Sequence, residues 1–320
     1  MNIQDILNEH QVPNIWWSKS GLPGIIKTTG DDIIDLIHRL STNNCMNVTQ
    51  HVGKQTILTN EKGRIIDIIT ILKRKEDYLM LTSSNNELQV IQWLKKFIIM
   101  EQIRFEIVTD EYEMITVHGA QSLDCISQLL NTHDLDIPIH SMIASMDFPS
   151  RIAIRLMPIH ELQFLVIDVK DTGLLNLFES SGIALFGESQ FERERILSGM
   201  GKYGHELSES YNPLEAGLLH LIDFKKGCYI GQEVIARLDS YNKVQKRLMG
   251  FISQYPIVQD SIISNDAKEI GNVTSALQST EYTIGLAFIR SEQAFPDSVV
   301  YATSEGISQL CTLLNLPMRS

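Results

Sequence analysis

The stretch from Lys226 to Glu233 reads Lys-Gly-Cys-Tyr-Ile-Gly-Gln-Glu and is followed by Arg237. It places a thiol, a phenol, an amide, a carboxylate and two cations within twelve positions of a 320-residue chain. Gly227 and Gly231 bracket the central Cys-Tyr-Ile, so the backbone can turn there in conformations closed to residues with a Cβ. Glu233 and Arg237 have the i,i+4 spacing of a helix that starts just after Gly231.

Cys228 is the candidate reactive or ligand-forming sulfur. The expected helix would place it near a helix amino end and beside Lys226, and both features favour thiolate over thiol. The alternative is a buried, inert cysteine, because free cysteines are commonly buried. Tyr229 could stack on a ligand or pack in the core. Gln232 and Glu233 could serve the site or only cap the helix.

Two further polar groups stand out from apolar or glycine-rich surroundings. Asp67 is flanked by isoleucines on both sides, and a buried carboxylate costs free energy unless it is hydrogen-bonded or paired; the alternative is an outward-facing strand residue. Arg195, Tyr203 and Glu206 surround a glycine-rich segment and could bind a flat, heteroatom-rich ring. The alternative is a glycine-capped helix end followed by an ordinary turn.

The motif from Lys226 to Arg237 resembles the signature of the YgfZ-type folate-binding proteins, which are related to the glycine-cleavage T-protein. Four other segments extend the resemblance over nearly the whole chain: Asn60–Arg64, Gly199–Glu206, Glu269–Ser275 and Gly285–Ala287. The family implies two interleaved α/β domains of the split βαβ, ferredoxin-like kind and a carboxy-terminal barrel around a central channel, which holds tetrahydrofolate or a derivative.

The resemblance also implies a function and roles for single residues. The expected function is an accessory factor in the assembly or repair of iron-sulfur proteins, including radical enzymes that thiomethylate tRNA; the expected partners are those proteins or their assembly machinery. Cys228 would be the working residue. Lys226 and Arg237 would tune its charge, and Gly227 and Gly231 would shape its loop. The folate contacts would be Asp67, Arg195, Tyr203 and Glu206.

Three departures from the T-protein branch bear on the function. That branch has an Asp-Asp pair where this chain has Asp67-Ile68, a glutamate at the position of Leu197, and Asp-Phe in place of Cys228-Tyr229. Losing a buried carboxylate that forms two hydrogen bonds would weaken folate binding by roughly a few kcal/mol, because hydrogen bonds to charged groups contribute about this much. Two alternatives stay open: an aminomethyltransferase that moves a one-carbon unit from a lipoyl carrier to tetrahydrofolate, and a folate-sensing binding module without chemistry.

Composition limits the remaining function classes. A formal net charge of −12 argues against general nucleic-acid affinity, although basic residues gather between Lys225 and Arg247. The four cysteines lie 80 or more residues apart, so neither a zinc site nor a disulfide framework is expected, and the chain alone lacks clustered thiolates for an iron-sulfur cluster. No signal peptide or membrane-spanning run is evident. We expect a cytoplasmic monomer.

Periodicity predicts an α+β chain. Residues 33–40 and 88–98 have helical patterns, and residues 56–72 form a hairpin with Gly63 in its turn. Further strands are expected at 78–82, 104–108, 114–118, 151–156 and 162–168, and further helices at 172–180 and 190–197. Strands at 248–252, 269–274, 283–290 and 299–303 suggest a small barrel. The expected domains are 1–244, with one subdomain at roughly 31–110, and 245–320.

Overall fold

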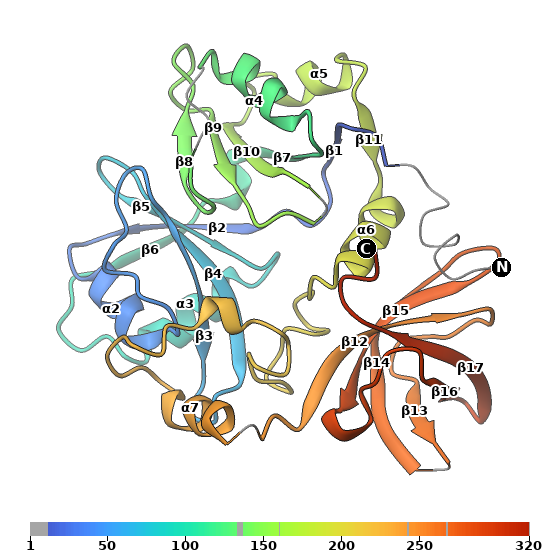
Figure 1. Cartoon of the computed structure of the whole chain (residues 1–320). Helices are drawn as coiled ribbons and strands as arrows, with labels where there is room; N and C mark the ends of the chain where they lie inside the picture. The colour runs from blue at the N-terminus through green and yellow to red at the C-terminus, as the bar shows by residue number, and fades with distance from the viewer. Residues whose placement is uncertain (1–11, 133–136, 160, 242, 267, 320) are drawn as a thin grey trace. The chain divides into compact units, whose positions relative to one another are not determined.

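The computed structural model describes residues 12–319 except 133–136, 160, 242 and 267. The chain divides into two compact units. Figure 1 shows their elements, coloured by residue number from the amino to the carboxyl terminus. The first unit contains Val12–Glu188 and His220–Gln232. The second contains Ser189–Leu219 and the part of the chain that begins at Glu233.

A five-stranded antiparallel sheet carries the amino-terminal part of the first unit, in the order β3-β4-β5-β2-β6. Its strands are β2 (Gly24–Thr29), β3 (Lys54–Thr59), β4 (Ile65–Lys73), β5 (Tyr78–Thr82) and β6 (Arg104–Ile107). Helices α2 (Ile33–Leu40) and α3 (Glu87–Lys95) contribute their apolar side chains to a core shared with this sheet. Burial of that shared apolar surface is the main term that holds helix and sheet together.

A six-stranded sheet forms the other half of the first unit, in the order β11-β1-β7-β10-β9-β8. Its elements are β1 (Trp16–Ser18), η1 (Thr109–Glu111), β7 (Tyr112–His118), α4 (Ser122–Leu130), β8 (Met142–Ala144), β9 (Ile152–Arg155), β10 (Gln163–Val169), α5 (Leu174–Glu179) and β11 (Ala184–Phe186). Because β1 precedes β2 in the sequence while β7 follows β6, the chain enters this sheet, leaves it and returns. The two α/β sheets are therefore interleaved, as expected.

The second unit contains a closed six-stranded barrel in the order β12-β15-β14-β13-β16-β17. Its strands are β12 (Lys246–Ser253), β13 (Ile262–Asn265), β14 (Lys268–Gln278), β15 (Thr283–Arg290), β16 (Val299–Ser304) and β17 (Ile307–Leu314), with η3 (Ser291–Gln293) between β15 and β16. Among the described residues, the chain passes from one unit to the other at three points in the sequence, within helix α6 (Glu188–Ser198), within the short η2 (Leu219–Leu221) and within helix α7 (Gln232–Ser240). The barrel interior is filled by apolar side chains, including Phe251, Ile263 and Leu313.

The predicted mixed α/β class and the carboxy-terminal barrel are confirmed. The predicted hairpin is confirmed as β3 and β4, and Gly63 has the positive φ of 67° that its turn position needs. Short strands such as β1, β8 and β11 were not predicted, because three residues give no readable periodicity. The domain boundary after residue 244, the central channel and the monomeric state stay predictions. None of the helices in the described part of the chain has both the length and the apolar character needed to cross a bilayer.

Candidate functional site

The Lys226–Glu233 segment packs against the turn of the β3–β4 hairpin. Thr59 Oγ1 donates a hydrogen bond of 2.6 Å to the carbonyl of Ile230. Gly231 has φ of 82°, and a Cβ added there would lie 2.6 Å from the carbonyl oxygen of Asn60 and 2.8 Å from Cα of Gly63. Only glycine fits this left-handed position with backbone so close. Two segments that carry the family resemblance therefore meet in space.

Gly227 differs from Gly231 in this respect. A Cβ added at Gly227 would meet nothing within 4 Å, and its φ is not positive. Of the two glycines predicted to shape the loop, the geometry requires Gly231 alone. The predicted helix after Gly231 is confirmed as α7, which begins at Gln232.

Lys226 anchors the loop to the end of α2. Its side chain is buried, and Nζ donates hydrogen bonds to the carbonyls of His38, of Ser41 at 2.6 Å and of Asn43 at 3.0 Å. These carbonyls lie at and just beyond the carboxyl end of the helix, where backbone acceptors lack partners and the helix dipole favours a cation. Burial lowers the pKa of Lys226 to about 8. Since its ammonium is engaged in this way, tuning of Cys228 by Lys226 stays a prediction.

Cys228 is the one exposed cysteine in the described part of the chain. Cys45 and Cys311 are buried and Cys125 is partly buried. Burial raises the pKa of the Cys45 thiol, of Cys125 to about 11 and of Cys311 to about 12. The alternative of a buried, inert Cys228 is therefore wrong, and this thiol is the one that solvent-borne reagents can reach first. No group of histidine, cysteine and carboxylate side chains that could hold a metal ion occurs among the described residues.

Tyr229 next to it points inward. The residue is 7% exposed, its ring centroid lies 5.3 Å from Lys226 Nζ, and burial raises its pKa to about 12. Its hydroxyl is buried without a hydrogen-bond partner within the described residues. A buried phenol usually has a partner, so this oxygen could take a hydrogen bond from a ligand or water. Further along the motif, Gln232 is partly buried, and Glu233 and Arg237 are exposed on α7.

Asp67 lies on β4 and is fully buried, so the outward-facing alternative is wrong. One carboxylate oxygen accepts hydrogen bonds from the amide of Ile68 at 2.8 Å and from Ser83 Oγ at 2.6 Å. The other accepts from the amide of Ser83 at 3.1 Å and from Asn86 Nδ2 at 2.9 Å. Burial raises the pKa of Asp67 to about 6, although these four donors oppose the shift.

The contacts of Asp67 decide what it can do. Two oxygens that each accept two hydrogen bonds have used about all the acceptor sites of a carboxylate. A ligand would therefore replace one donor, and the Ser83 hydroxyl is the donor that can rotate away. Ser83 and Asn86 were missed by sequence reasoning. The run of serines and asparagines between β5 and α3 is a helix-start signal that could have indicated them.

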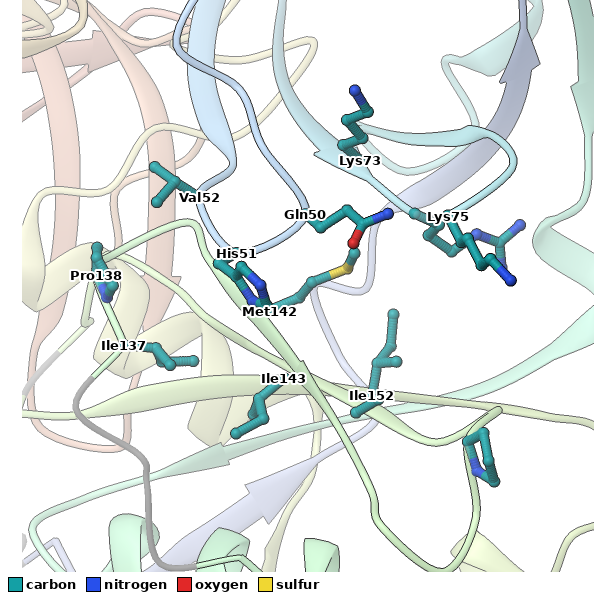
Figure 2. Close-up of a pocket in the computed structure, with 13 residues that line it drawn as sticks. Gln50, His51, Val52, Lys73, Lys75, Ile137, Pro138, Met142, Ile143 and Ile152 are labelled. Carbon is teal, nitrogen blue, oxygen red and sulfur yellow. The ribbon is translucent and has the colours of Figure 1, made fainter.

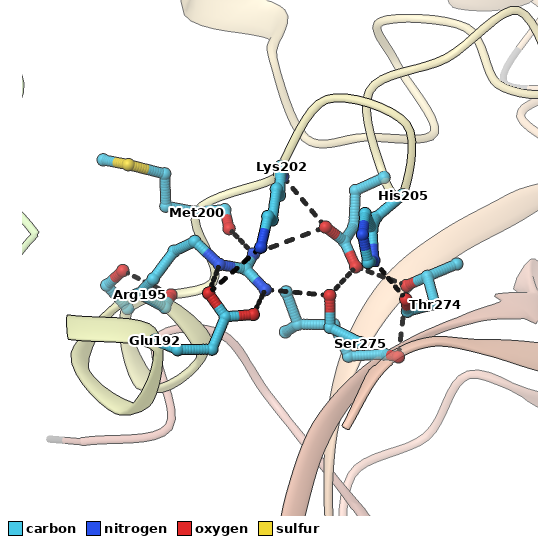
Figure 3. Close-up of polar contacts among 10 residues, drawn as sticks. Glu192, Arg195, Met200, Lys202, His205, Thr274 and Ser275 are labelled. Atoms are coloured by element: carbon cyan, nitrogen blue, oxygen red, sulfur yellow. Dashed lines mark hydrogen bonds and ion pairs between the residues drawn. The ribbon is translucent and has the colours of Figure 1, made fainter. Parts of the chain in front are cut away.

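Arg195 and Glu206 meet in a buried polar network in the second unit. Figure 3 shows Arg195 of this network with Glu192 and Ser275. Arg195 binds Glu192 through two hydrogen bonds of 2.9 and 2.7 Å, donates 2.8 Å to Ser275 Oγ and lies 3.3 Å from Glu206. Burial opposes its charge, but hydrogen bonding to Glu192 and the charge of Glu206 hold the pKa of Arg195 above its usual value. Such a fixed, bidentate pair rigidifies the end of α6.

Glu206 is fully buried and accepts four hydrogen bonds, so its acceptor sites are occupied as well. The donors are Arg195, the amide of Lys202 at 2.9 Å, Thr274 Oγ1 at 2.5 Å and Ser275 Oγ at 2.7 Å. Here again two resemblance segments, Gly199–Glu206 and Glu269–Ser275, come together. Tyr203 is partly buried and forms a backbone bridge with Leu207. Folate contacts by Arg195, Tyr203 and Glu206 stay predictions.

An interleaved pair of α/β sheets followed by a closed barrel defines a class of folds that solved structures share. The glycine cleavage system aminomethyltransferase T from Bartonella henselae superposes with a TM-score of 0.80 over 99% of this chain and 89% of its own, at 14% identity. At that identity the likeness shows the fold.

Residues 23–148 match the model of the GCVT N-terminal domain. A putative transferase from Arabidopsis thaliana is 28% identical over 85% of this chain, which spans 64% of that protein's length. Aminomethyltransferases from Chlorobaculum tepidum and a Synechocystis strain are 22% and 25% identical; the matches cover 90% and 83% of this chain and 82% and 75% of those proteins. These findings support the GcvT-like superfamily. The YgfZ-type assignment stays a prediction.

Proposed function

We propose that the chain binds tetrahydrofolate or a derivative and transfers a one-carbon unit, with aminomethyl transfer as the first candidate reaction. Relatives named aminomethyltransferase match 83 to 90% of the chain, and a solved aminomethyltransferase has the same fold. These findings favour the transferase, the alternative in the sequence analysis, over the accessory factor.

The burial and raised pKa of Asp67 are the structural observation that carries this proposal. A carboxyl group whose pKa is raised to about 6 can hold or release a proton near neutral pH, which one-carbon transfer at a folate nitrogen requires. The donors around Asp67 are all uncharged, so no cation fixes it in the ionised state. The buried, unpartnered hydroxyl of Tyr229 offers a second polar contact that suits a heteroatom-rich ring.

The first experiment measures binding and turnover separately. Wild type, Asp67→Asn and Cys228→Ala are titrated with tetrahydrofolate by calorimetry and then assayed for methylenetetrahydrofolate formation from an aminomethylated lipoyl carrier protein. The proposal expects wild type and Cys228→Ala to bind and turn over. Asp67→Asn should bind but lose about 10²- to 10⁴-fold in rate, which is the usual contribution of one general acid or base. Folate binding without turnover in wild type would refute aminomethyl transfer.

A second candidate is the accessory factor in iron-sulfur protein assembly or repair, with iron-sulfur proteins or their assembly machinery as partners. The exposed thiol of Cys228 favours it, because aminomethyl transfer needs no thiol at this position. The loop that carries Cys228 is held rigidly on both sides, by Lys226 at α2 and by Gly231 at the hairpin turn. A thiol on such a support suits transient ligation or attack on an oxidised species.

Cells that lack this protein separate the two candidates. Thiomethylated tRNA and iron-sulfur enzyme activity are measured after complementation with wild type or with Cys228→Ala. Loss of both readouts, restored by wild type alone, would favour the accessory factor with Cys228 at its centre. Glycine cleavage that fails while both readouts persist would favour the transferase. Folate-dependent partner binding with neither phenotype would leave the sensing module. A cytoplasmic monomer without stable nucleic-acid binding is part of all three proposals.

A further inference from the structure

The carboxyl group of Asp67 has no exposed surface, so a proton that it releases must pass through one of its neighbours. Its Oδ1 accepts hydrogen bonds from the amide of Ile68 at 2.8 Å and from the Ser83 hydroxyl at 2.6 Å. Its Oδ2 accepts from the amide of Ser83 at 3.1 Å and from Asn86 Nδ2 at 2.9 Å. A group hands a proton on when it can accept as well as donate, so the chemistry of these four donors selects the route.

The Ser83 hydroxyl is the one group of the four that can do both. A hydroxyl oxygen carries two acceptor lone pairs besides its hydrogen, whereas backbone amides and a side-chain amide nitrogen are donors alone. The hydroxyl donates to ionised Asp67 and can turn to accept from neutral Asp67. A proton on Oδ2 would instead face two N–H groups, neither of which can accept it. The proton of neutral Asp67 therefore belongs on Oδ1, directed at Ser83 Oγ.

Ser83 also connects the buried carboxyl group with its surroundings. Ser83 is partly exposed, whereas Asn86 is 2% exposed. Asp67 is the one hydrogen-bond partner of the Ser83 hydroxyl within the described residues, so the remaining position on that oxygen is available. The contacts that set the pKa of Asp67 are burial, which raises it to about 6, and its uncharged donors, which oppose the rise. The proton can thus leave near neutral pH, and the hydroxyl is its way out.

This route does not open into the cavity of about 700 Å³ that Figure 2 shows in the first unit. The cavity reaches the turn between β4 and β5 through Arg74. Strand β4 ends at Lys73, six residues beyond Asp67, which is about 20 Å at 3.3 Å per residue. Neither Asp67 nor Ser83 nor Asn86 lines the cavity. A ligand that exchanges a proton with Asp67 therefore has to lie beside Ser83.

We propose that Ser83 is the proton relay of Asp67. Asp67 gives its proton from Oδ1 to Ser83 Oγ, and Ser83 gives its own hydroxyl hydrogen to a basic nitrogen of the ligand beside it. Asp67 becomes a carboxylate, Ser83 is again a hydroxyl, and the ligand has gained one proton. Asn86 is a positioning residue, because its N–H group keeps the proton off Oδ2. That the ligand is a folate rests on the function proposed above, whereas the route from Oδ1 to Ser83 does not.

Infrared difference spectra test the direction of the proton without folate. They compare about pH 4 with about pH 8, on either side of the pKa of about 6. Wild type should show a carboxylic-acid C=O band that is missing in Asp67→Asn. Ser83→Val should move this band to higher frequency, because the acid O–H loses its acceptor. Ser83→Thr, which has nearly the same shape and keeps a hydroxyl, should leave it in place. Ser84→Val, at the exposed neighbouring serine, is the matched control and should also leave it in place.

A pH jump tests the relay itself. After a jump from about pH 8 to about pH 5, the Asp67 band should appear at least tenfold more slowly in Ser83→Val than in wild type, and as fast as in wild type in Ser83→Thr and Ser84→Val. An unmoved band in Ser83→Val would show that the proton does not face Ser83. Equal rates of appearance in Ser83→Val and Ser83→Thr would show that the proton takes another path. Either result would overturn the proposal.

Turnover links the relay to the proposed function. Ser83→Val should lose about 10²- to 10⁴-fold in rate at unchanged tetrahydrofolate affinity, as Asp67→Asn should. Asp67→Asn/Ser83→Val should lose no more than Asp67→Asn alone, because both changes interrupt one route. Additive losses would mean that Ser83 acts apart from Asp67, against the proposal. Absence of turnover in wild type, together with the expected band shift and slow protonation in Ser83→Val, would refute the proposed function and leave the relay established.

Discussion

Gly231→Ala tests whether the motif loop is built on the hairpin turn. An alanine at φ of 82° costs about 1–2 kcal/mol for the left-handed conformation alone. The added Cβ would also lie 2.6 Å from the carbonyl oxygen of Asn60, which is backbone and cannot swing away, and overpacking of this kind costs about 1–3 kcal/mol. The sum is about 2–5 kcal/mol. Gly227→Ala meets nothing within 4 Å and should change stability by less than about 1 kcal/mol.

Tryptophan fluorescence makes the measurement specific to the first unit. The three tryptophans of the chain are Trp16, Trp17 and Trp93, and all three lie buried in that unit. In urea, Gly231→Ala should lower the unfolding midpoint by about 0.7–2.5 M for a slope of about 2–3 kcal/mol per M. Equal midpoints for Gly231→Ala and Gly227→Ala would refute the reasoning, because they would mean that the loop does not need the contact with the turn.

Three further changes probe the site residues. As the pH rises from 4 to 7, the free energy of unfolding of wild type should fall by up to about 3 kcal/mol relative to that of Asp67→Asn. The reason is that the folded state, in which the pKa of Asp67 is raised to about 6, binds this proton more tightly than the unfolded state does; parallel pH profiles in urea would contradict this. Arg195→Met should destabilise the second unit by about 3–5 kcal/mol in calorimetry, since Glu206 is left buried without a cation; Lys202→Met, at a half-exposed pair, should cost less than about 1 kcal/mol. Ellman's reagent should label one thiol rapidly in the native protein and none in Cys228→Ala; a rapid second thiol would show that a buried cysteine becomes accessible.

The elements that the sequence predicted are those with a strong local pattern. The apolar stripe of Ile33, Leu36 and Leu40 shows the period of a buried helix face, and all three side chains are buried in α2. The turn residues around Gly63 marked the hairpin. Strand β1, in contrast, is three residues long and pairs with β7 and with β11, which lies about 170 residues further along the chain. Pairings of that kind depend on the tertiary fold, so no local pattern announces them.

The site could be predicted as a set of residues but not as a set of contacts. The sequence motifs singled out Asp67, Arg195, Glu206 and Cys228. In the structure Cys228 is exposed to solvent and the other three are buried. Spacing could not show that Lys226 reaches back almost 190 residues to the carbonyls at the end of α2. A sequence reveals which side chains can donate or accept, whereas their partners follow from the fold.

Glu206 and Asp67 are both buried and fully hydrogen-bonded, but they differ in the charge of their donors. Glu206 has four donors that include Arg195, so its charge is balanced inside the protein and its removal should act mainly on stability. Asp67 also has four donors, but none is charged, and its pKa is raised to about 6. The four hydrogen bonds of Glu206 thus include one from a cation, whereas those of Asp67 leave a carboxyl group whose raised pKa allows it to exchange a proton. Of these two buried carboxylates, Asp67 is therefore the one whose substitution should separate folate binding from turnover.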